Sequence, residues 1–200
     1  PLDGATVEEM YRNGWVSSIG GLFQYGRKYM YTPWQGYNPS NNLGNQTADI
    51  PWQNDTHMPC PEGYRVPTRS ELNSLLPKNQ EIPGTYIAGN GEKITATLHV
   101  GEGTLTTPTG VTGTQQYVKF TSEDTGRYLI IPLAGGKGDK STTNNPSFGK
   151  RAVLWTSERN GCPGGYAWTY WLPFEGKETT AIAERQLQME AFASLRCVKK

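Results

Sequence analysis

The sequence is poor in histidine and charge, and it has no long apolar run. Its two histidines, His57 and His99, match none of the usual zinc-ligand spacings with the three cysteines, so no metal is expected. No apolar stretch approaches 18 residues, so no membrane insertion is expected in this chain. The net charge is +1 and charged residues are 18%, which argues against a nucleic acid or an anionic membrane as a partner.

Catalytic signatures are also missing. There is no G-x-S-x-G nucleophile elbow, no P-loop and no dinucleotide fingerprint. Two glycine-rich strings, at 135–138 and 161–165, do not lie between a clear strand and a clear helix, so neither is expected to hold a phosphate. We therefore predict no catalytic residue and no cofactor, and a protein that is not an enzyme.

Glycine, proline and aromatic residues are abundant instead. The 200 residues include 24 Gly, 14 Pro, 11 Tyr and 6 Trp, and 35% are hydrophobic. This composition is typical of a loop-rich β protein, and the length suits one packed domain over residues 1–200. The chain begins Pro-Leu-Asp without a signal-like pattern, so any export signal or anchor is expected to lie outside it.

The stretch CPEGYRVPTRSEL, residues 60–72, combines a turn with a helix start. Thr68 and Glu71 have the spacing of a capping box. Leu72, Leu75 and Leu76 are expected on one inward helix face, and Pro77 is expected to end the helix. A second short helix is predicted at residues 5–11.

The remaining pattern predicts strands and long loops. Two hairpins are expected, with turns at 89–91 and 122–126, and a flexible edge strand or loop at 101–113. Strands are also expected within 15–31, 151–157, 165–175 and 191–198. In the third of these, Tyr166, Trp168 and Tyr170 share one face and Trp171 takes the other. Residues 32–59 are predicted to form a long ordered loop.

Several segments resemble one protein family. CPEGYRVPTRSEL is similar to the central motif of the Fibrobacter succinogenes major paralogous domain and its relatives in Bacteroides surface proteins. In the family's order, GLFQYGRK at 21–28 resembles "yqWGRk", LIIPLAG at 129–135 resembles "lPlAGy", LWTS at 154–157 resembles "yWSs", and SLRCVK at 194–199 resembles "svRCVk". Two parts depart from the pattern: the first twenty residues do not match it, and 82–126, longer than the family's spacer, would be an insertion.

The resemblance implies an α+β, C-type-lectin-like fold, mostly antiparallel β with one or two short helices, of the kind also seen in formylglycine-generating enzymes. It also implies a disulfide between Cys60 and Cys197, with buried free cysteines as the alternative. Cys162 would be a spare thiol. The calcium-dependent lectin signatures E-P-N, Q-P-D and W-N-D are absent, so calcium-mediated sugar binding does not follow from such a fold.

The main candidate for a binding surface is the polar segment 135–150. Its Asp139, Asn144 and Asn145 offer hydrogen-bonding groups for sugar hydroxyls, with an apolar ring beside them at Phe148. The alternative is a mobile solvated loop. Trp34 and Tyr37 are the second candidate, as a platform for stacking on a sugar, although such aromatics more often anchor a long loop to the domain.

Three functions remain open. The first is a cell-surface adhesion module, at a fimbrial tip or in a lipoprotein of a bacterial outer membrane, that binds a glycan or a host protein through its loops. The second is a structural module that binds other subunits of a surface assembly. The third is an oxidase like the formylglycine-generating enzymes, which requires two neighbouring redox cysteines at a copper site; Cys162 and Cys197 stand in no such motif. The first is favoured by family analogy.

Overall fold

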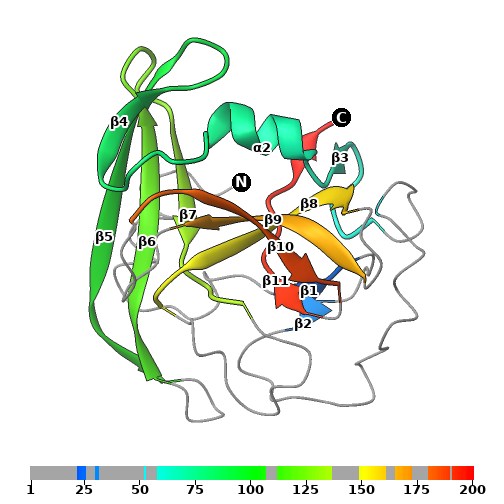
Figure 1. Ribbon diagram of the computed structural model, residues 1–200. Coiled ribbons are helices and arrows are strands. Elements are labelled where there is room, and N and C mark those ends of the chain that lie inside the picture. The colour runs from blue at the N-terminus through cyan, green and yellow to red at the C-terminus, as the bar shows by residue number, and fades with distance from the viewer. Residues whose placement is uncertain are drawn as a thin grey trace.

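The computed structural model describes residues 22–25, 30–31, 52, 58–106, 112–136, 149–160, 165–172, 180–189 and 191–200. Within these ranges the chain is mostly antiparallel β with one short helix, α2 (Arg69–Leu75), as Figure 1 shows. The strands are β1 (Leu22–Gln24), β2 (Met30–Tyr31), β3 (Tyr64–Arg65), β4 (Gly84–Ile87), β5 (Lys93–Thr106), β6 (Thr112–Ser122), β7 (Tyr128–Pro132), β8 (Ala152–Arg159), β9 (Tyr166–Leu172), β10 (Ala183–Gln188), β11 (Phe192–Ala193) and β12 (Val198–Lys199).

The largest sheet has the order β4-β5-β6-β7 and is built from successive hairpins. Both predicted turns are confirmed: Gly91 and Gly126 adopt φ of 86° and 70°, the left-handed region that glycine enters without steric cost. Residues 101–106, predicted as an edge strand or a loop, continue β5, and Thr104 pairs with Thr114 of β6 beyond an irregularity in the register. The sheet therefore extends further from the core than the sequence indicated.

A second sheet has the order β10-β9-β8 and lies beside the first, with α2 crossing above it (Figure 1). The strands predicted at 151–157 and 165–175 are confirmed as β8 and β9. Strand β10 was not predicted, because its sequence AERQLQ has little apolar alternation. It is held instead by a continuous backbone register with β9, from Ala183 opposite Trp171 to Gln188 opposite Tyr166.

Helix α2 begins and ends as the sequence predicted. Thr68 and Glu71 form both hydrogen bonds of the capping box, and the helix stops before Pro77. One prediction about its inner face is wrong. Leu72 and Leu76 are buried, at 3% and 0% exposure, but Leu75 is 37% exposed. Leu76 leaves the helical conformation (φ −124°, ψ 70°) and turns into the core, which leaves Leu75 at the margin of the buried face.

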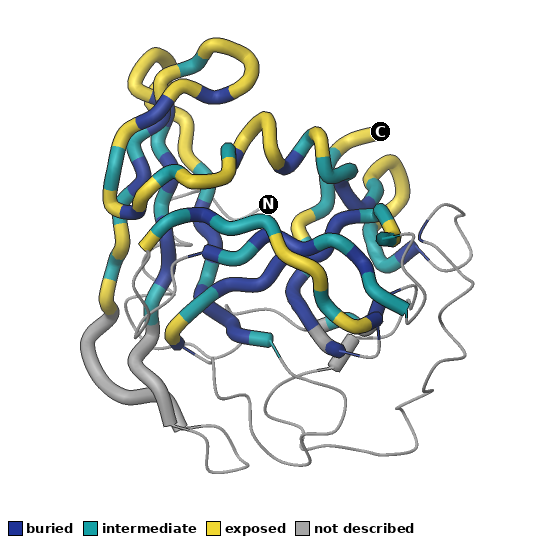
Figure 2. The backbone as a smooth tube through the Cα atoms, in the orientation of Figure 1, coloured by how far each residue is buried: buried dark blue, intermediate teal, exposed yellow. Residues whose placement is uncertain are grey.

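The main core lies between α2 and the two large sheets. Leu72 and Leu76 of the helix region share one buried cluster with Val118 and Phe120 of β6 and with Tyr170 of β9. In Figure 2 the buried backbone follows the central strands, and the outer side of α2 is exposed. The helix is thus fixed over the β8–β10 sheet by apolar contacts, which sets the position of its polar residues.

A second cluster joins the ends of the chain. Trp155 is fully buried, its indole N–H donates to the Phe23 carbonyl at 2.8 Å, and its ring lies 5.5 Å from that of Tyr25. Trp52 is the one described residue between 32 and 57. It is 2% exposed and its ring centre lies 4.8 Å from that of Tyr25, in agreement with an anchoring role.

The strands expected within 15–31 are confirmed as β1 and β2, which form a sheet with β11. The predicted helix at 5–11 lies outside the described residues.

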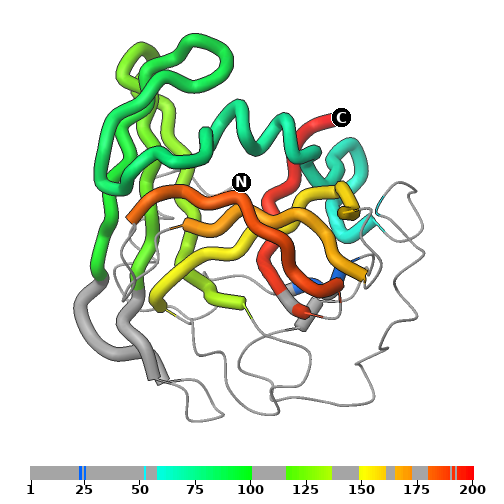
Figure 3. The backbone as a smooth tube through the Cα atoms, in the orientation of Figure 1, coloured from blue at the N-terminus to red at the C-terminus, as the bar shows by residue number. Residues whose placement is uncertain are grey.

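The Cys60–Cys197 disulfide is present, with an S–S distance of 2.05 Å. It lies beside the pair of strands β3 and β12, in which Arg65 is opposite Val198. Figure 3 shows these segments, 137 residues apart in sequence, side by side at one edge of the molecule. The disulfide therefore ties the segment that leads into α2 to the last strand.

Candidate functional site

The candidate residues of the two predicted binding segments lie outside the described residues. These are Asp139, Asn144, Asn145 and Phe148 in the polar segment, and Trp34 and Tyr37 in the aromatic one. The ends of the polar segment are described. Gly135 N–H donates to the Arg151 carbonyl and Gly149 N–H donates to the Leu133 carbonyl, each at 2.8 Å. Both described ends of the polar segment are therefore held by backbone hydrogen bonds.

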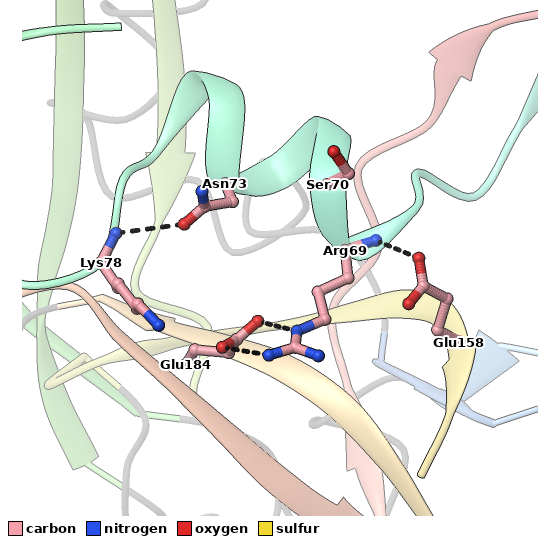
Figure 4. Close-up of a pocket in the computed structure, with 6 residues that line it drawn as sticks. All are labelled: Arg69, Ser70, Asn73, Lys78, Glu158 and Glu184. Carbon is pink, nitrogen blue, oxygen red and sulfur yellow. Dashed lines mark hydrogen bonds and ion pairs between the residues drawn. The ribbon is translucent and has the colours of Figure 1, made fainter. Parts of the chain in front are cut away.

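The described residues form a polar cavity of about 340 Å³ between α2 and the β8–β10 sheet (Figure 4). This volume is within the range of small-molecule sites, roughly 300–1,000 Å³. No residue predicted to bind a ligand lines it. The lining residues are Arg69, Ser70, Asn73, Lys78, Glu158 and Glu184.

An ion pair fixes the wall of the cavity. Arg69, the first residue of α2, donates hydrogen bonds through its guanidinium to both carboxylate oxygens of Glu184 on β10. The Glu184 side chain is 9% exposed, so its charge is partly removed from water and depends on this partner. The hydrogen bonds from Arg69 hold the pKa of Glu184 below its usual range, and the nearby positive charge of Lys78 acts in the same direction.

Two aromatic residues of β9 support this ion pair from below. The guanidinium carbon of Arg69 lies 4.0 Å from the centre of the Trp168 ring, a cation–π contact. The Tyr170 hydroxyl lies 3.3 Å from both the Arg69 carbonyl and a Glu184 carboxylate oxygen. Burial raises the pKa of Tyr170, and the Glu184 charge raises it further. The tyrosine therefore stays protonated and can donate to either acceptor.

A second carboxylate fixes the start of the helix. Glu158, on β8, accepts a hydrogen bond from the Arg69 backbone N–H at 3.0 Å. Glu71 closes the capping box and accepts two hydrogen bonds from Arg65, one of them at 2.7 Å. The Arg65 hydrogen bonds lower the pKa of Glu71 to about 2. The end of α2 next to the cavity is therefore held by both β8 and β3.

The opposite end of the cavity has hydrogen-bonding groups that remain available. Figure 4 shows Lys78, just beyond α2, reaching toward Glu184 from the far end of the helix. The Asn73 side-chain oxygen accepts a weak hydrogen bond from the Lys78 backbone N–H at 3.5 Å, which leaves its amide NH₂ for a ligand. Within the part of the chain that the structure describes, the Lys78 ammonium and the Ser70 hydroxyl have no hydrogen-bond or ion-pair partner.

The cavity could not be recognised from sequence as a set. Its residues come from three separate parts of the chain, around 69–78, at 158 and at 184, and only the fold brings them together. A partial signal was present, because Ser70 and Asn73 are three residues apart and lie on the same side of the predicted helix.

The described residues lack two kinds of feature. No group of three or more His, Cys, Asp or Glu side chains among them is arranged to hold a metal ion. No helix in the same part of the chain is long and apolar enough to cross a membrane.

The family model of the Fibrobacter succinogenes major domain matches residues 7–199 of the 200. The match contains every motif noted in the sequence. It also extends over residues 7–20, which the motifs alone did not include, and residues 82–126 lie within it. Comparisons with curated proteins and with solved structures find no match.

Proposed function

The chain belongs to the Fibrobacter succinogenes major domain family, and we propose that it is a non-enzymatic binding module of a bacterial cell-surface protein. The module would recognise a glycan or a host protein in an adhesion role. One observation carries the proposal: the cavity beside α2 is open, polar and held in shape by contacts to two strands of one sheet, β8 and β10. A prearranged site of this kind binds a polar ligand without first having to order its own side chains.

We also propose that the β-rich architecture is a C-type-lectin-like domain formed by residues 1–200. The Cys60–Cys197 disulfide supports this, because it joins the segment before α2 to the last strand in the way that the family resemblance implies. Such a disulfide is stable in an oxidising compartment, which agrees with a position outside the cell. Binding in this domain would use surface residues, among them the cavity and the polar segment 135–150.

An oxidase function is less well supported. That chemistry would require two neighbouring redox cysteines, and two of the three cysteines, Cys60 and Cys197, are bonded to each other. The cavity also has neither cysteine nor histidine in its lining. Its arginine and one of its glutamates neutralise each other, and this arrangement suits recognition of a ligand better than proton transfer.

A structural role in a surface assembly is the second candidate. Strand β4 ends the order of its four-stranded sheet, and its Ile87 is 60% exposed. An open strand edge with an apolar side chain can pair with a neighbouring subunit. The neighbour would then bind along β4, away from the cavity lining.

A binding screen separates these functions. The purified chain would be applied to a glycan array and to a panel of host-surface proteins, together with a Ser70→Ala/Asn73→Ala variant. We expect the parent chain to bind at least one probe, and the variant to lose most of that binding while keeping the parent's melting temperature within a few degrees. Binding to no glycan and no protein would contradict the adhesion proposal. A concentration-dependent self-association removed by Ile87→Lys would then favour the assembly role.

A further inference from the structure

The cavity beside α2 has two chemically different ends. At one end Glu158 accepts the Arg69 backbone N–H through one carboxylate oxygen, and its second oxygen remains an acceptor. At the other end lie the Lys78 ammonium and the Asn73 amide, both of them donors. Figure 4 shows Glu158 and Lys78 at opposite ends of the helix, with Ser70 and Asn73 between them.

The charges of the cavity lining do not act equally on a ligand. Arg69 and Glu184 are paired through two hydrogen bonds, so their charges largely cancel. This leaves Lys78 as the cavity cation that forms no hydrogen bond or ion pair among the described residues. Its charge acts on Glu184 only through longer-range attraction, and Glu184 is already paired with Arg69. The Lys78 end is therefore suited to an anionic group, and its ammonium would form a charge-assisted hydrogen bond with it.

The dimensions limit the ligand to a few polar groups. Ser70 and Asn73 are three residues apart, or about 4.5 Å along the helix axis. A cavity of about 340 Å³ is at the small end of ligand sites. A ligand that uses both ends would present an anion to Lys78 and hydroxyl donors to Glu158. Glu158 would repel a second anionic group placed near it.

We propose that this cavity binds a carboxylated sugar residue, with the sugar carboxylate at Lys78 and Asn73 and the sugar hydroxyls at Ser70 and Glu158. A uronic acid or a sialic acid carries both kinds of group on one ring. A neutral sugar would leave the Lys78 ammonium without an anion, and a phosphate or sulfate without hydroxyls would leave Glu158 without a donor. The inference rests on the proposed binding function and adds the class of ligand.

The test uses probes that differ only in their charged group. Trigalacturonate and 3′-sialyllactose would be titrated calorimetrically into the full chain, with the methyl esters of both as uncharged counterparts. At least one acidic probe is expected to bind, and its counterpart to bind at least tenfold more weakly. The affinity should also fall as salt is raised, because the contact at Lys78 is electrostatic and close to solvent.

Substitution then locates the contact. Lys78→Gln is expected to lower the affinity for the acidic probe at least tenfold. Lys78→Arg is expected to keep most of the parent's affinity. Lys199→Gln is the matched control, because Lys199 is an exposed lysine on β12 outside the cavity lining, and it should change the affinity less than twofold. Thermal melts of all variants would verify that each is folded.

Two results would overturn the inference. One is an acidic probe that binds no better than its neutral counterpart, and the other is an unchanged affinity in Lys78→Gln. Binding of a neutral glycan or of an acidic peptide alone would reject the carboxylated sugar while supporting the binding function. A chain that binds nothing in the wider glycan and protein screen would reject the binding function itself.

Discussion

Arg69 joins Glu184 to Trp168: its guanidinium pairs with the carboxylate and lies 4.0 Å from the centre of the indole ring. The three residues come from α2, β10 and β9, so one side chain connects the helix to two strands of the sheet beneath it. Arg69 and Glu184 also line the cavity. Stability and the shape of the cavity therefore depend on the same side chain.

We expect Arg69→Ala to lower the free energy of unfolding by about 2 kcal/mol. Removing one partner of a buried ion pair costs roughly 3–5 kcal/mol, and the 38% exposure of the Arg69 side chain reduces that penalty. Urea denaturation would measure the difference. Lys93→Ala is the control, because Lys93 pairs with Glu123 in a more exposed ion pair and its loss should leave the midpoint nearly unchanged. Equal stability of Arg69→Ala and the parent would show that the pair with Glu184 contributes nothing.

The corrected helix face gives a second prediction. Leu76→Ala should cost about 2–5 kcal/mol, because the fully buried side chain leaves a cavity in the core. Leu75→Ala should cost at most about 1 kcal/mol, because its side chain is already 37% exposed. The two variants differ by one position, and each is the control for the other in a denaturation series. A larger loss of unfolding free energy in Leu75→Ala than in Leu76→Ala would show that Leu75 belongs to the inner face of the helix, as the sequence predicted.

These two leucines also show where sequence reasoning stops. The start of α2 was predictable because the capping box is a local interaction between Thr68 and Glu71. The two hairpins were predictable for the same reason, since Gly91 and Gly126 sit in turns that require their conformational freedom. The direction in which Leu76 leaves the helix is set by its C-cap geometry and by packing against both sheets, neither of which has a local signal.

Strand β10 and the cavity depend on contacts between distant parts of the chain. The sequence AERQLQ has no regular apolar alternation, and it forms a strand because β9 offers it a free edge. Glu184 reaches the cavity only through that pairing, and Glu158 reaches it through β8. A motif search could therefore find Arg69 and Ser70 but could not identify the carboxylates they would meet.

The disulfide gives a third prediction. Reducing it, or replacing Cys60 and Cys197 together by Ala, should destabilise the chain by up to about 5 kcal/mol in the chain-entropy model for a sequence separation of 137 residues. The expected loss is large because the bond restricts a long loop of the unfolded chain. Thermal unfolding with and without reductant would measure it. A Cys162→Ala variant is the control, and its melting temperature should fall with reductant by as much as that of the parent.

The Glu71 carboxyl gives a fourth prediction, on acid stability. Its pKa is about 2 in the folded chain, because Arg65 and the Thr68 backbone bind the charged form, against a usual value of 4.5. A lowered pKa stabilises the fold above pH 4.5, and this contribution is lost as the pH falls toward 2. The side chain is 40% exposed, so screening by solvent reduces the effect to about 1 kcal/mol.

Urea midpoints at pH 6, 4 and 3 would test this. The parent should lose stability over that range, and Glu71→Gln should start lower and lose less. Glu184 also has a lowered pKa and also contributes to the loss of stability in acid. A Glu184→Gln variant measures that contribution, so that it can be subtracted. Parallel pH profiles for the parent and Glu71→Gln would mean that Glu71 is not a source of the pH dependence.

The last prediction concerns the polar segment 135–150, the binding surface that the sequence favours. Replacing Asp139, Asn144 and Asn145 together by Ala should change the free energy of unfolding by no more than about 0.5 kcal/mol, the usual range for surface substitutions. The backbone hydrogen bonds of Gly135 and Gly149 at the two ends of the segment should survive the change, because they do not involve those side chains.

Calorimetry with the glycan that the array identifies would then compare the affinity of this triple variant with that of Lys78→Gln. Loss of affinity only in Lys78→Gln assigns binding to the cavity, and loss only in the triple variant assigns it to the polar segment. Loss in both would show that one ligand spans the two surfaces.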